Sequence, residues 1–369
     1  MIYLVDYKTA STTFTEVIED NAYPQRVHWF PETYDRVKTG MVYPAHVMAG
    51  KVVTEELINY VKNNPVKGKS GFILAAGSQS WAGVHGKKEY TNENRLHYQF
   101  KLPLVCLTNI YAGRLASMFG VSDFVSTDAS ACASSIKVLM DVQNLMRNYG
   151  FDRIIVVGVE DGVNNSTLEF FGQAKASLLL KDEGNILPSA FDSVNAGFNV
   201  GQGSVCAIFE REPVHTQPKA RLLGAYTSAE DFGNTLGQRP DGQGYQRAIE
   251  GALFDGKSKP KDVSIIKTHG TGTVTNNTAE KNAITSVFND FVATSYKQRI
   301  GHTLAASGLM ETGLLLDDIS KGFIPAILNR TEEDKQFLSS DSQVPDGLIM
   351  SLAAGMGNVY SAALWSKEI

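Results

Sequence analysis

Residues 127–135, TDASACASS, place a cysteine among small residues between a β-prone run and a long helical pattern. The β-prone run covers residues 124–126, and the helical pattern covers residues 136–148 with a wide apolar face. Small neighbours leave room for an acyl group on Cys132. A helix N-terminus supplies unpaired N–H groups and a positive field, which favour a thiolate and a developing oxyanion. The stretch is therefore a candidate nucleophile turn, although most lone cysteines are small buried apolar residues.

The composition excludes several functional classes. The chain has 369 residues, 43% of them hydrophobic and 20% charged, and a net charge of −5 gives no reason to expect nucleic acid. No apolar run approaches the roughly 20 residues that span a bilayer, and residues 1–6 are typical of a first strand rather than a signal peptide. The chain has three widely spaced cysteines: Cys106, Cys132 and Cys206. This spacing predicts neither a disulfide framework nor a metal site, so we expect a protein of the reducing cytoplasm.

Strand-forming and helix-forming segments alternate along most of the chain. Helices are expected at residues 54–63, 109–119, 136–148, 245–254 and 278–288. Strands are expected at residues 71–77, 153–159, 204–209, 263–267, 348–352 and 360–365. Buried strands between helices predict a parallel sheet covered on both faces. Each half has a buried strand that enters a Gly/Ser/Thr turn, at 71–78 and 263–273, which suggests an internal duplication.

Two downstream histidines lie in turns as rich in small residues as the turn at Cys132. His269 begins the turn HGTGT after the expected strand at 263–267. His302 opens an expected helix of very small residues that ends at Gly322. One such histidine is compatible with a structural role, but two of them together with a cysteine at a helix start favour nucleophilic catalysis. Their spacing is so wide that only a fold brings the three side chains together.

Taken in order, these segments resemble the β-ketoacyl synthases of the elongating type, which are condensing enzymes of the thiolase-like fold. The matching segments are ACASS (131–135), VGVE (157–160), FD…GF…GQG (191–203), RPDG (239–242), HGTGT with Glu280 (269–280), K…GH (297–302) and IPAILN (324–329). The resemblance covers roughly residues 70–369. It implies an α/β fold of two pseudo-duplicated α/β/α halves that form a five-layered αβαβα core. The corresponding division is an N-terminal half, 1–218, with the nucleophile and a C-terminal half, 219–369, with both histidines.

The resemblance implies a decarboxylative Claisen condensation in fatty acid or polyketide-type biosynthesis. Cys132 would carry the acyl group. His269 and His302 would bind the thioester carbonyl of a malonyl group and stabilise the enolate left by loss of CO2. Lys297 would be a supporting charge near His302, and Glu280 a structural or water-ordering partner.

Further roles follow from the same resemblance. Thr271 and Thr273 would either touch a pantetheine arm or cap their turn, and both interpretations stay open. Backbone N–H groups of Cys132 and of Ala354 or its neighbour are candidates for an oxyanion hole. The chain departs from the family where a bulky gatekeeping Phe becomes Ala354 and the following GFGG loop contains Met356. These departures favour an altered acyl pocket and a specialised pathway.

The resemblance also implies partners. An acyl carrier protein would deliver substrates on its phosphopantetheine, and no metal or organic cofactor is expected. The chain would form a homodimer, or a heterodimer with a related ketosynthase-like subunit, with residues 153–159 as a candidate interface strand. One alternative is a non-catalytic partner of the chain-length-factor kind, and another is a thiolase-type enzyme or acyltransferase. The intact set of Cys132, His269, His302 and Lys297 argues against the first, and two histidines without a second catalytic cysteine argue against the second.

Overall fold

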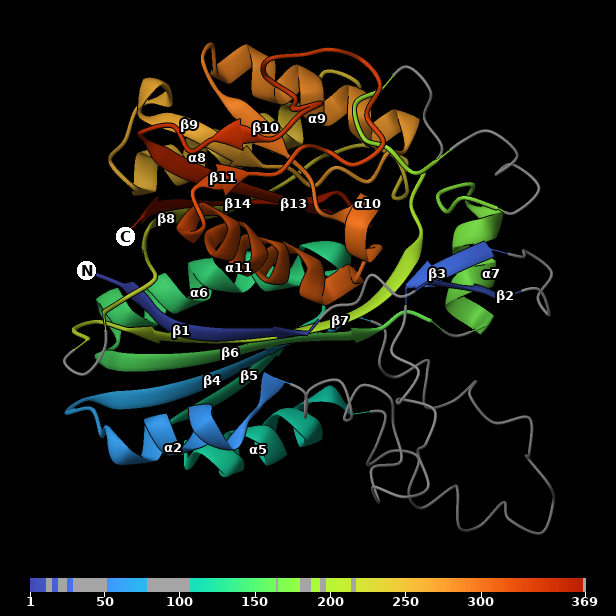
Figure 1. The fold of residues 1–369 in the computed structure, drawn as a ribbon. Helices are drawn as coiled ribbons and strands as arrows, with labels where there is room; N and C mark the ends of the chain where they lie inside the picture. Colours follow the sequence, from blue (N-terminus) through green and yellow to red (C-terminus); the bar gives the residue numbers. More distant parts are fainter. Residues whose placement is uncertain are drawn as a thin grey trace, which may run out of the picture.

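Each half of the chain builds one β-sheet, and the two sheets stand between three layers of helices in the computed structural model (Figure 1). The αβαβα layering implied by the family resemblance is confirmed. The expected loop at 78–95 and Cys106 lie outside the described residues. The structure describes residues 1–10, 15–18, 25–28, 52–77, 107–163, 165–179, 187–192, 197–213 and 217–367.

The sheet of the N-terminal half has the strand order β5-β4-β6-β7-β1. Its strands are β1 (Tyr3–Ala10), β4 (Lys69–Ala75), β5 (Phe124–Asp128), β6 (Phe151–Asp161) and β7 (Val200–Glu210). β4 pairs in parallel with β5 and β6, whereas β7 pairs antiparallel with β6 and β1. The expected parallel pairing is found among β4, β5 and β6, and β7 adds an antiparallel strand because the chain returns through it in the opposite direction.

The sheet of the C-terminal half repeats this arrangement, in the order β10-β9-β13-β14-β8. Its strands are β8 (Ala220–Ala229), β9 (Val263–Lys267), β10 (Val292–Thr294), β13 (Leu348–Gly355) and β14 (Val359–Lys367). In both sheets the strands, ranked along the chain, stand in the order third, second, fourth, fifth, first. The two sheets join where β1 pairs with β8. This matching order confirms the internal duplication that the two Gly-rich turns suggested.

The helices fill the remaining layers according to their apolar faces. α2 (Glu55–Asn63) and α5 (Thr108–Phe119) cover the outer face of the N-terminal sheet. α8 (Gln243–Asp255) and α9 (Val274–Val287) cover the outer face of the C-terminal sheet. The central layer, between the sheets, is made by α6 (Ser134–Asn148) and α11 (Ser307–Ser320). The smaller elements are β2 (Thr15–Ile18), β3 (Gln25–His28), α7 (Asn165–Gln173), α10 (Lys297–Ile300), β11 (Phe323–Ile324) and β12 (Ser342–Gln343).

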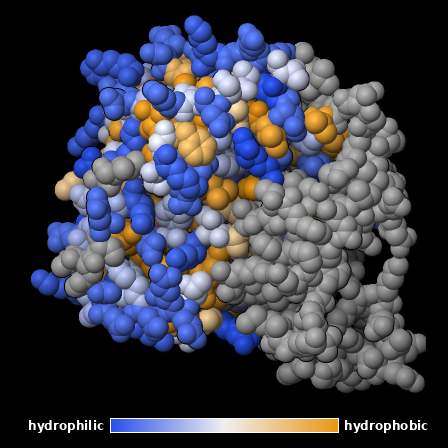
Figure 2. All heavy atoms as spheres, in the orientation of Figure 1, coloured by the Kyte–Doolittle hydropathy of each residue, from blue (hydrophilic) through white to orange (hydrophobic). Residues whose placement is uncertain are grey.

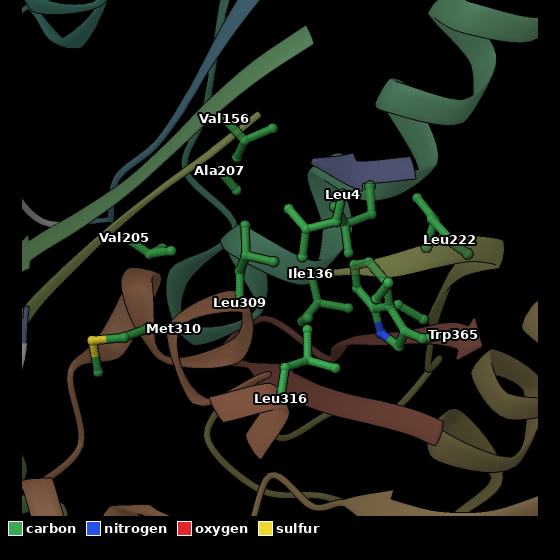
Figure 3. Packing of buried hydrophobic residues seen from close by; sticks show 14 of the residues in the cluster. Leu4, Ile136, Val156, Val205, Ala207, Leu222, Leu309, Met310, Leu316 and Trp365 are labelled. Atoms are coloured by element: carbon green, nitrogen blue, oxygen red, sulfur yellow. The ribbon is translucent and has the colours of Figure 1, made fainter. Parts of the chain in front are cut away.

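The two central helices approach each other closely at their first turns. A Cβ on Gly308 would lie 2.4 Å from Ile136 Cγ1, so only glycine fits at this position of α11. The amide of Leu309 donates a hydrogen bond of 3.1 Å to Ser135 Oγ across the same contact. Figure 3 shows Leu309, Ile136 and Trp365 in the cluster that surrounds this contact. The contact brings the N-terminal ends of α6 and α11 together.

Most expected boundaries are correct, and local chemistry explains where helices end. α5 ends at Gly120, whose φ of 73° suits the left-handed C-cap. The helix expected at 278–288 begins earlier, at Val274. The helix expected to open at His302 begins instead at Ser307, because Leu304 has a φ of 46° and the chain first forms a 3-10 turn.

Residues 153–159, expected as a candidate interface strand, have no free edge for pairing with another chain. They lie within β6, whose two edges are paired with β4 and β7. In the described part of the chain β5 pairs with β4 alone and ends the sheet. β5, which precedes Cys132, therefore has an edge that can pair with another chain, whereas β6, which follows α6, does not.

Hydrophilic side chains cover most of the described surface on the face drawn in Figure 2, with apolar residues in smaller groups between them. Within the described ranges no helix combines the length and apolar character needed to cross a membrane.

Replacement of Leu309 by alanine should lower the free energy of unfolding by about 2–5 kcal/mol, because the side chain is buried between the sheets. Urea denaturation followed by circular dichroism measures this loss. Leu314→Ala is the matched control on the same helix, where the side chain is only half-buried. Equal losses in the two variants would contradict the central position assigned to Leu309.

Candidate active site

The turn that carries Cys132 has a strained backbone and is stabilised by one side-chain hydrogen bond. Ala131 has a φ of 47°, a conformation that costs a non-glycine residue about 1–3 kcal/mol. Residues Ala131–Ala133 form a 3-10 turn between β5 and α6, and Ser134 Oγ donates a bond of 2.7 Å to the carbonyl of Ala131. A Cβ on Gly355 would lie 2.5 Å from the Ser130 carbonyl oxygen, so the end of β13 lies directly against this turn. Cys132 is 6% exposed.

His269 stands just beyond the end of β9, in a turn fixed by glycine and by one carboxylate. Gly270 and Gly272 have φ values of 54° and 78°. Glu280, from α9, accepts the backbone N–H of His269 at 2.5 Å and that of Gly270 at 2.9 Å. The same carboxylate accepts a bond of 3.0 Å from Asn276 Nδ2. This geometry supports the structural role expected for Glu280.

His302 lies on an extended segment beside the start of β7. Its amide donates to the Asn199 carbonyl at 2.7 Å, and its carbonyl accepts from the amide of Gly201 at 3.0 Å. The two imidazole rings lie 5.5 Å apart between centroids, at 80° to each other. The ring of Phe198 packs edge-on against His302, with the centroids 4.8 Å apart.

One cavity of about 260 Å³ brings most of the expected residues together. Seven of the expected site residues line it: Cys132, Thr271, Thr273, His269, His302, Ala354 and Met356. A second cavity of about 360 Å³ also reaches Cys132, on the side formed by β6, α7 and Leu304. A third cavity, of about 940 Å³, lies between α6, β8 and α8, and none of these side chains lines it. The nucleophile therefore stands between two compartments.

Residues of α7, which sequence reasoning missed, form the boundary between the two compartments. Phe170 and Phe171 line both cavities, as does Met356, which is 39% exposed. Phe171 contacts Phe198 edge-on, with 5.2 Å between the centroids. Ala354 is buried on β13 and offers only a methyl group to the cavity. The adjacent aromatic pair at 170–171 was the signal in the sequence that pointed to this role.

The two threonines of the HGTGT turn contact each other. Their hydroxyl oxygens are 3.0 Å apart, and both side chains line the cavity of the histidines. Thr273 is the N-cap residue of α9, yet its side chain makes no capping hydrogen bond. This geometry favours contact with a bound molecule over a capping role for Thr273.

Lys297 does not line the cavity but belongs to a buried cluster behind it. Its Nζ lies 2.7 Å from Glu311 Oε1, and Lys267 Nζ lies 3.1 Å from Glu311 Oε2. Lys267 also donates to the Leu352 carbonyl at 2.9 Å. Sequence reasoning missed both Lys267 and Glu311. A lysine inside a run predicted to be a buried strand was the available signal, because buried charges require partners.

Burial decides the protonation of the site. It raises the pKa of Cys132 to about 12, and the charge of Lys297 only partly opposes this effect. The same burial, assisted by Lys297, lowers the pKa of His269 and of His302 well below the ordinary value. At neutral pH the site therefore holds a protonated thiol and two neutral imidazoles. The helix N-terminus was expected to favour a thiolate at Cys132, and burial acts in the opposite direction by raising the pKa of the thiol.

A thiolate at Cys132 consequently needs a proton acceptor within the cavity, and the neutral imidazoles are available for this purpose. The Nδ1 atoms of His269 and His302 are buried and have no hydrogen-bond partner among the described residues. Because Nδ1 of each ring is buried, Nε2 is the nitrogen left to reach a molecule bound in the cavity. No group of three or more metal-ligating side chains is assembled in the part of the chain that the structure describes.

These features define a class: proteins of the thiolase-like fold with a cysteine and two histidines on one cavity. Residues 12–215 match the family model of the β-ketoacyl synthase N-terminal domain, and residues 219–331 match that of the C-terminal domain. The chain belongs to the β-ketoacyl synthase family.

Individual relatives agree with this assignment. The chain is 28% identical over 244 residues to "3-oxoacyl-[acyl-carrier-protein] synthase 2" of Synechocystis, covering 64% of this chain and 58% of that protein. It is 26% identical over 267 residues to the "Tetracenomycin polyketide synthase ketoacyl synthase alpha subunit" of Streptomyces glaucescens, covering 67% of this chain and 61% of that protein. The matches thus span less than two thirds of either relative.

Solved structures share the fold over the whole chain. A type II polyketide synthase ketosynthase in complex with its acyl-carrier protein superimposes with a TM-score of 0.84 at 18% identity, covering 99% of this chain and 98% of that one. A ketosynthase in complex with its chain length factor from Xenorhabdus doucetiae gives a TM-score of 0.79 at 17% identity, with coverage of 99% and 98%.

Alkylation of Cys132 by iodoacetamide should be slow at neutral pH and should keep rising well above pH 9. The thiolate is the reactive form, and an ordinary thiol with a pKa of about 8.5 would level off earlier. Peptide-resolved mass spectrometry measures the rate at each pH, with buried Cys206 as the internal control. A rate that levels off below pH 8 would contradict the protonated resting thiol.

Proposed function

We propose that this protein is an active β-ketoacyl synthase that condenses an acyl group, held on Cys132, with a malonyl group carried by an acyl carrier protein. One observation carries the proposal: the thiol and two neutral imidazoles line a single cavity. Lys297 supports the site from behind, through Glu311.

In the first half-reaction Cys132 Sγ attacks the carbonyl carbon of an acyl thioester. The carbon–sulfur bond to pantetheine breaks, and the proton of the thiol passes through an imidazole to the departing pantetheine thiolate. Neutral imidazole suits this transfer, because it accepts one proton and returns it. The product is an acyl-Cys132 thioester.

In the second half-reaction the malonyl thioester loses CO2 and becomes an enolate. Nε2–H groups of His269 and His302 donate to its oxygen, where the negative charge develops. The carbanion attacks the carbonyl of acyl-Cys132, the bond to Sγ breaks, and a β-ketoacyl thioester leaves on the carrier. The chemistry needs only the thiol, the imidazoles and the thioesters, so we propose no resident cofactor.

The two compartments fit the two substrates. The cavity with the histidines would hold the pantetheine arm beside Thr271 and Thr273. The cavity beside α7 would hold the acyl chain, with Phe171 and Met356 at its entrance. Ala354 leaves space at the position of the family's gatekeeping Phe, which supports an unusual acyl chain and a specialised fatty acid or polyketide-type pathway.

The acyl carrier protein is the proposed substrate-bearing partner. The proposed subunit partner is a second copy of this chain or a related ketosynthase-like subunit, paired along the edge of β5. Val125 is 39% exposed on this strand, which agrees with an edge that is covered in a dimer. Cys132 and Cys206 are free thiols, which supports a reducing cytoplasmic location.

The nucleophile is tested by intact-mass measurement after incubation with acyl-carrier thioesters of several chain lengths. The wild type should gain one acyl group, and Cys132→Ala should gain none. His269→Ala should still form the acyl adduct but should lose condensation by about 10²–10³-fold, because one donor to the enolate is missing.

Acylation of the wild type separates an active enzyme from a non-catalytic partner subunit. The lengths accepted by the wild type report the acyl compartment. If no donor acylates the wild type, the chain is a non-catalytic partner subunit of the chain-length-factor kind, or an enzyme that needs one.

Val125→Lys should convert the dimer to a monomer, because a charge on an edge strand prevents pairing with another edge. Size-exclusion chromatography with light scattering measures the mass. Phe254→Lys is the control, since Phe254 is 88% exposed on α8, which covers the C-terminal sheet, whereas β5 ends the N-terminal sheet. Loss of the dimer in the control alone would assign the interface to α8.

A further inference from the structure

Lys267 is the second cation of the buried cluster behind the cavity, and nothing in the proposed mechanism so far uses it. Its side chain and those of Lys297 and Glu311 are fully buried. Each oxygen of the Glu311 carboxylate contacts one lysine, so one anion is shared between two cations. When all three groups are ionised, the cluster has a net charge of +1.

The cluster links the two segments that carry the histidines. Lys267 ends β9 and stands two residues before His269, whose turn follows the strand directly. Lys297 begins α10, five residues before His302, and its carbonyl accepts a hydrogen bond of 2.9 Å from the amide of Gly301. Glu311, from the central helix α11, contacts both lysines and thereby ties one segment to the other.

Both imidazoles lie near the cluster of net charge +1, which disfavours a further positive charge on either ring. A protonated imidazole has two N–H donors, and each buried Nδ1 lacks a partner among the described residues. The charges of Lys297 and Lys267 both lower the pKa of His302 and of His269. The charges that act on both rings are those of Lys297 and Lys267. The other titratable groups of the site are Cys132 and Tyr360 in the cavity, Glu280 at the His269 amide, Glu311 between the lysines and Glu160 near Cys132.

We infer that Lys267 is a positioning residue for the condensation, which acts through the two histidines by keeping both imidazoles neutral. This inference rests on the proposed function. A neutral imidazole donates a hydrogen bond to the enolate without transferring its proton. An imidazolium would instead protonate the carbanion, giving CO2 and an acetyl thioester with no new carbon–carbon bond. Lys267 therefore protects the enolate until it attacks acyl-Cys132.

The test is the ratio of acetyl-carrier to β-ketoacyl product formed from malonyl-carrier by the full-length acylated enzyme, measured between about pH 8 and pH 6. Lys267→Gln removes one positive neighbour, so the imidazole pKa rises. The ratio should then increase as pH falls, about tenfold at a given pH for each unit by which the pKa rises. Lys267→Arg keeps the charge and should restore the wild-type ratio.

Two further variants separate charge from packing. Lys267→Gln combined with Glu311→Gln returns the cluster to a net charge of +1, so its ratio should approach that of the wild type. Lys321→Gln is the matched control, because Lys321 is an exposed lysine at the end of α11 that pairs with Asp318, and it should leave the ratio unchanged. Because the ratio compares two products of one enzyme, a loss of folded protein does not alter it.

The ¹⁵N signals of His269 and His302 give an independent readout that needs no turnover. In Lys267→Gln they should move toward the protonated form at a higher pH than in the wild type. Unchanged signals together with an unchanged ratio would overturn the inference and leave Lys267 a structural residue. A wild type that makes no β-ketoacyl product would refute the proposed function, while the histidine titration would still decide the role of Lys267.

Discussion

The close contact between α6 and α11 is the constraint on which the rest of the structure depends. Gly308 admits Ile136 where a Cβ would be only 2.4 Å away, and the Leu309 amide bonds to Ser135. Since α6 follows the nucleophile turn and α11 follows the segment of His302, this single contact sets the two catalytic segments side by side. The duplicated sheets on either side enclose it and exclude water from both.

Exclusion of water then determines the electrostatics of the site. A buried thiol stays protonated and buried imidazoles stay neutral, because each charged form loses hydration that nothing nearby replaces. The cluster of Lys267, Glu311 and Lys297 is the exception, since its charges neutralise each other in part. The site therefore combines neutral reacting groups with a fixed positive field, a combination suited to a reaction that forms anions.

The sequence predicted much of the fold where local rules decide it. Alternating apolar runs located β9 and α6, and small residues located the turns at Cys132 and His269. The sequence did not predict the features that depend on contacts between segments far apart in the chain. The direction of β7 depends on β6 and β1, and the start of α11 depends on the strained backbone at Leu304. The sharing of Glu311 by two lysines was equally hidden, because β9, α10 and α11 meet only in the folded chain.

The sequence by itself determined which residues are available for chemistry and the family to which they belong. Cys132, His269 and His302, each beside small residues, were identifiable because steric freedom around a reactive group is a local property. Only the tertiary structure decided their protonation, the two compartments that meet at the thiol, and the edge of the sheet that is free to pair. These properties depend on desolvation and strand order, which arise from residues that are far apart in the chain.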